Sequence, residues 1–134
     1  MIQKSIGTTL SVQQSNATVT IGRLRTIGEI RMTSDAEDIT ALDSPDGFRE
    51  YAQGLRDAGE VTVEGFYDST NAGQTLLRTL YLSGNTARFT VQFPDTSGIA
   101  FTAFVRQLAL GAAQVDKPVA FSAVLRITGK AEAL

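Results

Sequence analysis

The sequence contains no cysteine, histidine or tryptophan among its 134 residues. Without cysteine and histidine the chain has no disulfide, no thiolate nucleophile, no imidazole acid or base and none of the usual zinc ligands. Much common catalytic chemistry is therefore excluded, and we expect a protein that is not an enzyme and holds no cofactor. Glycoside hydrolysis would need a pair of carboxylates, and four acidic residues are the candidates: Asp43, Asp46, Asp57 and Glu60. Nothing in the sequence places two of them across a cleft, and we interpret them as charged loop residues that face solvent.

Long apolar runs and excess positive charge are also lacking. No run of about 18 apolar residues occurs, and residues 1–16 contain no apolar stretch of signal-peptide length, so we expect neither membrane insertion nor secretion. Lys and Arg number 12 against 14 Asp and Glu, a net charge of −2. A surface that grips phosphates is strongly basic, so sequence-specific nucleic-acid binding is disfavoured. A near-neutral or acidic wall past which DNA slides is compatible with this composition.

Metal and nucleotide motifs are weak. Asp35, Glu37 and Asp38 form a small acidic cluster that could attract a hard cation such as Ca²⁺, but the spacing lacks the glycine and the distal glutamate of an EF-hand loop. Gly129 and Lys130 match only the end of a P-loop, because the upstream glycine is missing. We therefore predict no metal site and no nucleotide site.

The length suits one domain with a core of its own, so we expect a single domain over residues 1–134. Residues 1–16 are polar, rich in Ser, Thr and Gln, and predict an N-terminal arm. Residues 33–59 contain several turn-forming pairs and scattered large apolar residues, which predicts a long loop. Loops of this length are usually functional or mobile, and the apolar residues indicate that this one docks on another surface.

Most other segments alternate apolar and polar residues as half-buried strands do. The pattern predicts one bent strand or a hairpin over residues 17–32 and further strands over residues 60–67, 87–93, 99–110 and 119–128. Residues 71–83 carry apolar residues at helical spacing between a capping cluster and Gly84, which predicts one amphipathic helix. The predicted fold class is mainly β (α+β): an antiparallel β-sandwich or partial barrel with one packed α-helix and a long loop.

The stretch over residues 39–70, ITALDSPDGFREYAQGLRDAGEVTVEGFYDST, resembles the central segment of tail tube proteins (major tail proteins) of long-tailed bacteriophages. The likeness extends to residues 7–10, to the helix after Asp68, to the turn at residues 93–95 and to the closing strand that ends at residues 127–129. These segments follow the family order along almost the whole chain.

The resemblance implies a sandwich flanked by a helix, six copies in a ring, and stacked rings whose lumen is a closed barrel of strands from all subunits. Closure between chains would remove exposed sheet edges. The implied partners are further copies of the chain, a tail-tip initiator, a tape-measure protein and a tail terminator. DNA would pass without sequence-specific binding. The implied location is the virion tail, assembled in the bacterial host cytoplasm.

Two departures from the family pattern matter. Gln53 stands where the family often has proline, and the chain ends soon after the last strand, so we expect no appended immunoglobulin-like domain and no adhesion role. The inner tube of a contractile injection or secretion system is an alternative with the same ring. A monomeric ligand-binding β-sandwich is an alternative of another class, but it would need exposed aromatic platforms, and the chain has no Trp and three Tyr.

Two sets of residues follow as candidate sites. Contacts between subunits or rings are predicted for the large apolar residues of the long loop: Leu42, Phe48, Tyr51 and Leu55. The lumen lining is predicted to come from the polar faces of two strands: Thr62, Glu64, Arg88, Thr90 and Gln92. We expect Arg88 to pair with an acidic neighbour such as Glu64. Whether the strand arginines, such as Arg106 and Arg126, face solvent or pair across a subunit boundary is open at this point.

Overall fold

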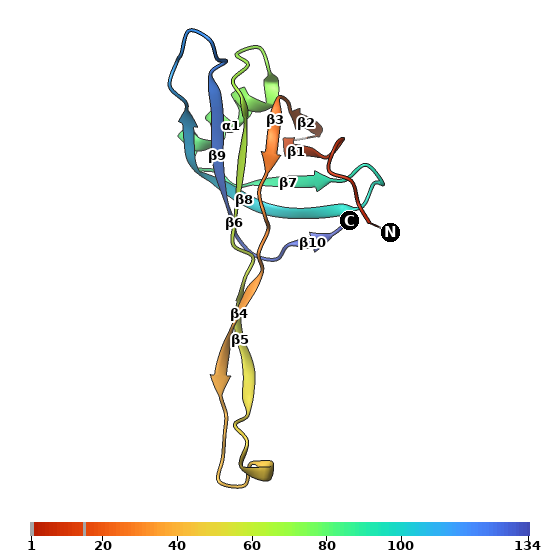
Figure 1. The fold of residues 1–134 in the computed structure, drawn as a ribbon, viewed down its shortest axis with the longest axis vertical. Helices are drawn as coiled ribbons and strands as arrows, with labels where there is room; N and C mark the ends of the chain where they lie inside the picture. Colours follow the sequence, from red (N-terminus) through yellow and green to blue (C-terminus); the bar gives the residue numbers. More distant parts are fainter. Residues whose placement is uncertain (1, 15) are drawn as a thin grey trace.

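The computed structural model describes residues 2–14 and 16–134, which form an antiparallel β structure with one α-helix (Figure 1). A sandwich makes up one part and a thin two-stranded hairpin, β4–β5, projects from it. The elements are β1 (Thr9–Gln14), β2 (Ala17–Ile21), β3 (Leu24–Ile27), β4 (Thr33–Asp38), η1 (Pro45–Gly47), β5 (Tyr51–Asp57), β6 (Glu60–Phe66), α1 (Ala72–Ser83), β7 (Ala87–Gln92), β8 (Gly98–Leu110), β9 (Ala120–Ile127) and β10 (Glu132–Ala133).

The sandwich is a single sheet folded on itself, with strand order β2-β1-β7-β8-β9-β6-β3 and β10 beside β8. The long strand β8 takes part in both halves of the folded sheet. Its residues 98–103 pair with β7, whereas its residues 103–110 pair with β9. The register shifts between Val105 and Gln107, and a bulge of this kind lets a strand pass from one sheet to another. In Figure 1, β7 runs across the direction of β6 and β9. We call β2-β1-β7-β8 the first layer and the second half of β8 with β9-β6-β3 the second layer.

Strands β2 and β3 belong to one bent segment that joins the two layers. β2 pairs with β1 at one end of the sheet, whereas β3 pairs with β6 at the other end. The bend lies at Gly22 and Arg23, where Arg23 adopts a left-handed φ of 64°. Of the two forms predicted for residues 17–32, the bent strand is therefore the one observed over residues 17–27.

The core lies between the layers and is built from the apolar face of each alternating strand. Phe89 of β7 stacks on Phe101 of β8 with ring centroids 5.9 Å apart. The fully buried side chains with the largest volumes are Phe89, Phe101, Leu10, Leu77, Leu125, Val12, Val61 and Val63. The predicted sandwich class is confirmed, and the sheet is not closed into a barrel within one chain.

The predicted irregular arm over residues 1–16 is wrong for Thr9–Gln14, which form β1 in the middle of the first layer. Leu10 and Val12 are fully buried there. Two alternating apolar residues were too short a pattern to indicate a strand. Residues 2–8 precede β1, and residues 1 and 15 lie outside the described residues.

The predicted helix is confirmed as α1. The side chain of Asn71 accepts a hydrogen bond from the backbone N–H of Gln74 at 3.1 Å, and Gly84 ends the helix with a left-handed φ of 73°. Leu76 and Leu77 point into the core. The helix packs on β8 and β2, so it covers one side of the sandwich.

The long loop predicted over residues 33–59 is wrong as local structure, because most of it is the β4–β5 hairpin. Its pairing runs from Thr33 opposite Asp57 to Asp38 opposite Tyr51. Every residue of β4 is exposed. Apolar alternation marks a strand only when one face is buried, and neither face of this hairpin packs on its own sandwich.

Candidate assembly surfaces

The tip of the hairpin is ordered by its own side chains. The backbone N–H of Ala41 donates to Ser44 Oγ at 2.9 Å, and this hydroxyl donates to Glu50 Oε2 at 2.8 Å. The N–H of Glu50 donates to Thr40 Oγ1 at 2.8 Å, and the N–H of Ile39 donates to the Glu50 carbonyl at 2.9 Å. Short polar side chains that satisfy nearby backbone groups fix a turn in this way. The tip is therefore a formed structure.

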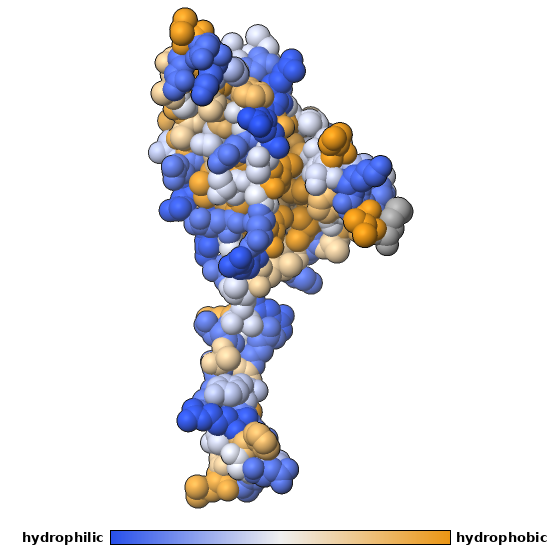
Figure 2. All heavy atoms as spheres, in the orientation of Figure 1, coloured by the Kyte–Doolittle hydropathy of each residue, from blue (hydrophilic) through white to orange (hydrophobic). Residues whose placement is uncertain are grey.

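Large apolar side chains project from this ordered hairpin. Leu42 is fully exposed, and the exposed fractions are 73% for Phe48, 56% for Tyr51 and 84% for Leu55. Figure 2 shows exposed apolar residues interspersed with hydrophilic ones at the hairpin end of the molecule. The structure thus places all four predicted contact residues on one projection, away from their own core. Exposed apolar surface of this kind is typical of interaction sites.

One ion pair joins the base of the hairpin to the second layer, and a second lies within that layer. Arg126 of β9 lies 2.7 Å from Asp57 at the end of β5, and Arg106 of β8 lies 2.9 Å from Glu60. The N–H of Gly59 donates to Asp57 Oδ1 at 2.8 Å. That hydrogen bond, followed by the contact with Arg126, lowers the pKa of Asp57 below its usual value. The direction of the hairpin is therefore tied to the second layer by charge-assisted contacts.

Arg88 does not pair with Glu64 as expected. Its guanidinium lies 3.0 Å from Glu132 of β10, because β10 runs beside β8 and sets Glu132 opposite Ala100. Glu64 lies on the second layer, two strands beyond β8. Arg106, Arg126 and Arg88 thus all have carboxylate partners within their own chain.

The five predicted lumen residues fall on two surfaces. Thr62 and Glu64 are exposed on the face of β6 that points away from the core, in the second layer. The other three lie on the corresponding face of β7, in the first layer: Arg88, Thr90 and Gln92. Because side chains of both layers converge on one core, the outer faces of the two layers point in different directions. One flat wall does not include both sets.

The second layer has two open edges within the described residues. β3 hydrogen-bonds to β6 on one side only, and residues 104–110 of β8 hydrogen-bond to β9 on one side only. An open strand presents unpaired N–H and C=O groups that can pair with another strand. The two edges lie at opposite ends of the same four-stranded layer.

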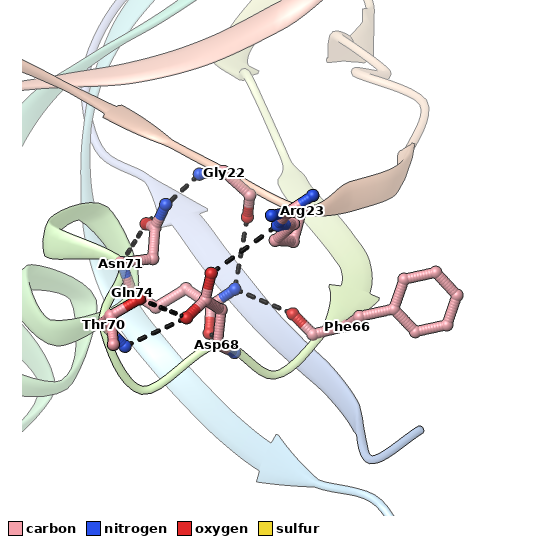
Figure 3. A network of polar contacts seen from close by, with 7 residues as sticks. All are labelled: Gly22, Arg23, Phe66, Asp68, Thr70, Asn71 and Gln74. Atoms are coloured by element: carbon pink, nitrogen blue, oxygen red, sulfur yellow. Dashed lines mark hydrogen bonds and ion pairs between the residues drawn. The ribbon is translucent and has the colours of Figure 1, made fainter. Parts of the chain in front are cut away.

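A buried polar residue that the sequence analysis missed holds the two layers together. Gln74 of α1 is 4% exposed, and its Nε2 donates to the carbonyls of Gly22 at 3.2 Å and Phe66 at 2.9 Å (Figure 3). Its Oε1 accepts from the N–H of Asp68 at 2.9 Å. The available signal was a polar residue on the apolar side of the helix, one turn before Leu77.

Two glycines let the bent segment between β2 and β3 lie close to β6 and α1, where Gln74 also binds. A Cβ at Gly65 would overlap the carbonyl oxygen of Arg23, and one at Gly73 would lie 2.6 Å from the Cα of Ile21. Arg23 also lies 3.5 Å from Asp68. The pKa of Asp68 is lowered chiefly by the Thr70 hydroxyl and N–H, and further by Arg23. These close approaches fix the packing of the bent segment on β6 and α1.

The described residues form neither a metal-ligand cluster nor a membrane-spanning helix. Within residues 2–14 and 16–134, no three Asp, Glu, His or Cys side chains are placed to hold one metal ion. None of the helices in the described part of the chain is long and apolar enough to cross a membrane.

Several solved structures share this fold. The chain is similar to a chain of the tail of an empty GTA particle computed with C6 symmetry, with a TM-score of 0.78, 19% identity and 98% of each chain covered. It is similar to the SPP1 tail tube, with a TM-score of 0.70, 15% identity and coverage of 94% of this chain and 75% of that chain. A sheath/tube terminator of the extracellular contractile injection system PVC has a TM-score of 0.72 at 9% identity, covering 100% of this chain and 98% of the other.

A search of curated proteins finds no match. The sequence model described as lambda phage tail tube protein matches residues 2–133, which is nearly the whole chain. The match agrees with a fold that has an ordered projection and open sheet edges within the described residues. The chain belongs to the lambda phage tail tube protein family and is a structural component of a virion tail, not an enzyme.

Proposed function

We propose that six copies of this chain form a ring and that the rings stack into a hollow tube through which DNA passes into the host. Family membership and the C6 symmetry of the similar GTA tail support this arrangement. The observation that carries the proposal is the pair of open edges on the second layer. β3 of one copy would lie beside the free half of β8 of the next copy. Two different edges make a head-to-tail contact, and repeated contacts of this type close a ring.

The outer face of the second layer then lines the lumen. Thr62 and Glu64 lie on this face together with Arg106 and Arg126, whose charges are paired with Glu60 and Asp57. Each free Lys or Arg that neutralised a phosphate would add a salt-sensitive attraction that retains the DNA. Because Arg106 and Arg126 are already paired with carboxylates, they add little of this attraction to the wall. We assign Arg88, Thr90 and Gln92 to the other surface of the ring.

The hairpin and the N-terminal segment are the joints of the tube in this proposal. The apolar side chains of the hairpin, Leu42, Phe48, Tyr51 and Leu55, contact other copies and lose their exposure there. The tail-tip initiator, the tape-measure protein and the tail terminator implied by the family resemblance complete the assembly. Residues 1–134 act as one tail-tube domain.

Electron microscopy tests the main proposal. Concentrated wild-type protein, with or without a tail-tip initiator, should give annuli or tubes of uniform diameter in negative stain. A chain that stays monomeric under all these conditions, and whose deletion leaves intact tails, contradicts the proposal.

Cysteine labelling tests the lumen assignment. Because the chain has no cysteine of its own, only the introduced cysteine reacts with the maleimide. Thr62→Cys should react with a small maleimide in assembled tubes but be protected from a bulky one that cannot enter the channel. Thr90→Cys on the first layer is the matched control and should be labelled by the bulky reagent more readily than Thr62→Cys. Equal labelling of Thr62→Cys by the bulky reagent in tubes and in free subunits would place this face outside.

A second candidate function is the inner tube of a contractile system, which the similarity to the PVC sheath/tube terminator favours. That similarity concerns the fold alone. Particles purified from producing cells discriminate the two: a contractile sheath around the tube supports the second candidate, and a bare tube supports the first.

A further inference from the structure

The charges of the chain are divided unevenly between hairpin and sandwich. Residues 33–57 carry seven carboxylates and only two arginines, Arg49 and Arg56, which gives the hairpin a net charge of −5. Of the 12 basic and 14 acidic residues in total, the rest of the chain keeps ten and seven, a net charge of +3. The overall charge of −2 hides this division. An acidic projection on a basic body favours contact between copies.

The acidic residues of the tip surround its apolar ones. Asp43 and Asp46 flank Ser44 and Pro45 and follow the fully exposed Leu42. Asp46 and Gly47 hold left-handed φ values of 56° and 72°, which turn the chain sharply at this point. Internal hydrogen bonds at the tip reduce the conformational entropy that is lost when it docks.

The body has a groove of about 850 Å³ with matching chemistry. It runs between residues 5–8, the segment from β3 to Ile30, and the β7–β8 turn. Its floor is apolar and includes Leu24, Ile27, Val91, Phe93 and Ile99. Residues 24–27 of β3 form one of its walls.

One cationic residue lines this groove and a second adjoins its lining in the sequence. Arg25 lines it and lies 5.5 Å from the ring of Phe66, and Lys4 directly precedes the lining residue Ser5. In the described part of the chain, no carboxylate side chain lies within ion-pair distance of either cation. Glu29, which also lines the groove, is held by Arg31 at 2.6 Å. Asp95 in the adjoining turn accepts hydrogen bonds from Ser97.

We propose that the groove receives the acidic, apolar hairpin tip of a second copy of this chain, with Leu42 and Phe48 on its floor and Asp43 and Asp46 facing Lys4 and Arg25. The inference rests on the proposed tube and names the receptor for its projecting hairpin. The tip does not reach the groove of its own chain, because the hairpin extends away from the sandwich while the groove lies beside the N-terminal segment (Figure 1). A tip and a groove on different parts of one surface make a contact that propagates from ring to ring.

Cross-linking tests the location of the contact. Asp43→Cys with Ile6→Cys should give an intermolecular disulfide in assembled tubes under mild oxidation, because Ile6 lines the groove. Asp43→Cys with Lys117→Cys is the matched control, since Lys117 lies in the β8–β9 loop outside the groove, and it should give little cross-linked product. Cross-linking of the control pair at the higher rate would overturn the proposal.

Charge reversal tests the chemistry. An exposed ion pair is worth a few tenths to about 1 kcal/mol, so Lys4→Glu should raise the protein concentration needed for tubes by about two- to five-fold and lower the salt sensitivity of assembly. Lys117→Glu makes the same change in net charge and should have a smaller effect. Lys4→Glu combined with Asp43→Lys restores opposite charges in every contact and should recover assembly.

The outcomes separate this inference from the proposed function. If wild-type chains form tubes while Lys4→Glu and Lys117→Glu act equally and the swapped double variant is not rescued, the groove assignment is wrong and the tube stands. If wild-type chains form no rings or tubes at all, the proposed function itself fails. Rescue of the swapped variant together with the 6–43 cross-link supports the assignment.

Discussion

The sandwich and the hairpin of this chain are both antiparallel β-structure, yet they are stabilised by different interactions. In the sandwich, alternate side chains such as Phe89 and Leu125 are removed from water, and this burial supplies most of the stability. In the hairpin, no residue of β4 is buried, and the strands are held by backbone pairing and side-chain hydrogen bonds at the tip. A two-stranded hairpin alone is marginal in water.

The difference indicates what each region is for. A region that buries its apolar face has a core of its own, whereas a region that exposes Leu42, Phe48 and Leu55 on an ordered frame requires contact with another molecule to bury them. The hairpin should therefore open locally at a small fraction of the global free energy in the free subunit. It should be protected from amide hydrogen exchange once assembled.

Matched Phe substitutions give the largest contrast between the regions. Phe89→Ala should lower the free energy of unfolding by about 3–5 kcal/mol, because it leaves a cavity in the core where Phe89 stacks on Phe101. Phe48→Ala removes the same atoms from an exposed position and should change the free energy of unfolding by no more than about 0.5 kcal/mol. Urea unfolding followed by circular dichroism measures both. Similar losses for the two variants would mean that Phe48 is part of the monomer core.

A matched pair of glutamines gives a smaller contrast. Gln74→Ala should cost about 1–3 kcal/mol of unfolding free energy, since it leaves the carbonyls of Gly22 and Phe66 without their side-chain donor. Gln53→Ala on the exposed face of β5 should be nearly neutral. Thermal unfolding of both variants is the measurement, and a neutral Gln74→Ala would show that water replaces the missing side chain.

The fold was predictable from the sequence where burial creates a pattern. β9 and α1 both bury one face, and their apolar spacing predicted them. The order of the strands was not predictable, because it depends on the bulge after Val105 that sends β8 from one layer to the other. The hairpin was read as a loop for the same reason: an unburied strand has no apolar alternation.

The candidate sites follow the same rule. The four apolar residues of the hairpin were predictable because exposed Leu and Phe among turn residues require a partner, although their role between subunits stays a prediction. The pairing of Arg88 with Glu132 was not predictable, because β10 is only two residues long. Gln74 was missed, since only the packing of α1 on the bend at Gly22 makes a polar side chain necessary there.

A substitution on the hairpin should separate assembly from folding. Leu55→Asp should leave the free energy of unfolding of the monomer within about 0.5 kcal/mol of wild type, because Leu55 is exposed. It should prevent tube formation, since it would place a charge in an apolar contact. Leu55→Met, which keeps the apolar volume, is the control and should assemble. Negative-stain microscopy and urea unfolding give the two readouts, and an unfolded Leu55→Asp monomer would assign Leu55 to its own core.

The smallest expected effect concerns the brace at the hairpin base. The pKa of Asp57 is lowered by the Gly59 N–H and then by Arg126, so the ionised carboxylate is the favoured form in the folded chain. The stabilisation is fully present above the pKa of Asp57 in the unfolded chain, about 3.8, and is lost as the pH falls through the lower folded pKa. The Gly59 amide signal in NMR spectra should report this titration.

Arg126→Gln should move the midpoint of the Asp57 titration upward, but not to the unfolded value, because the Gly59 hydrogen bond remains. The titration of Asp95, whose pKa is lowered by its Ser97 contacts, should stay unchanged in this variant. An unchanged Asp57 midpoint in Arg126→Gln would show that the guanidinium does not brace the hairpin in solution.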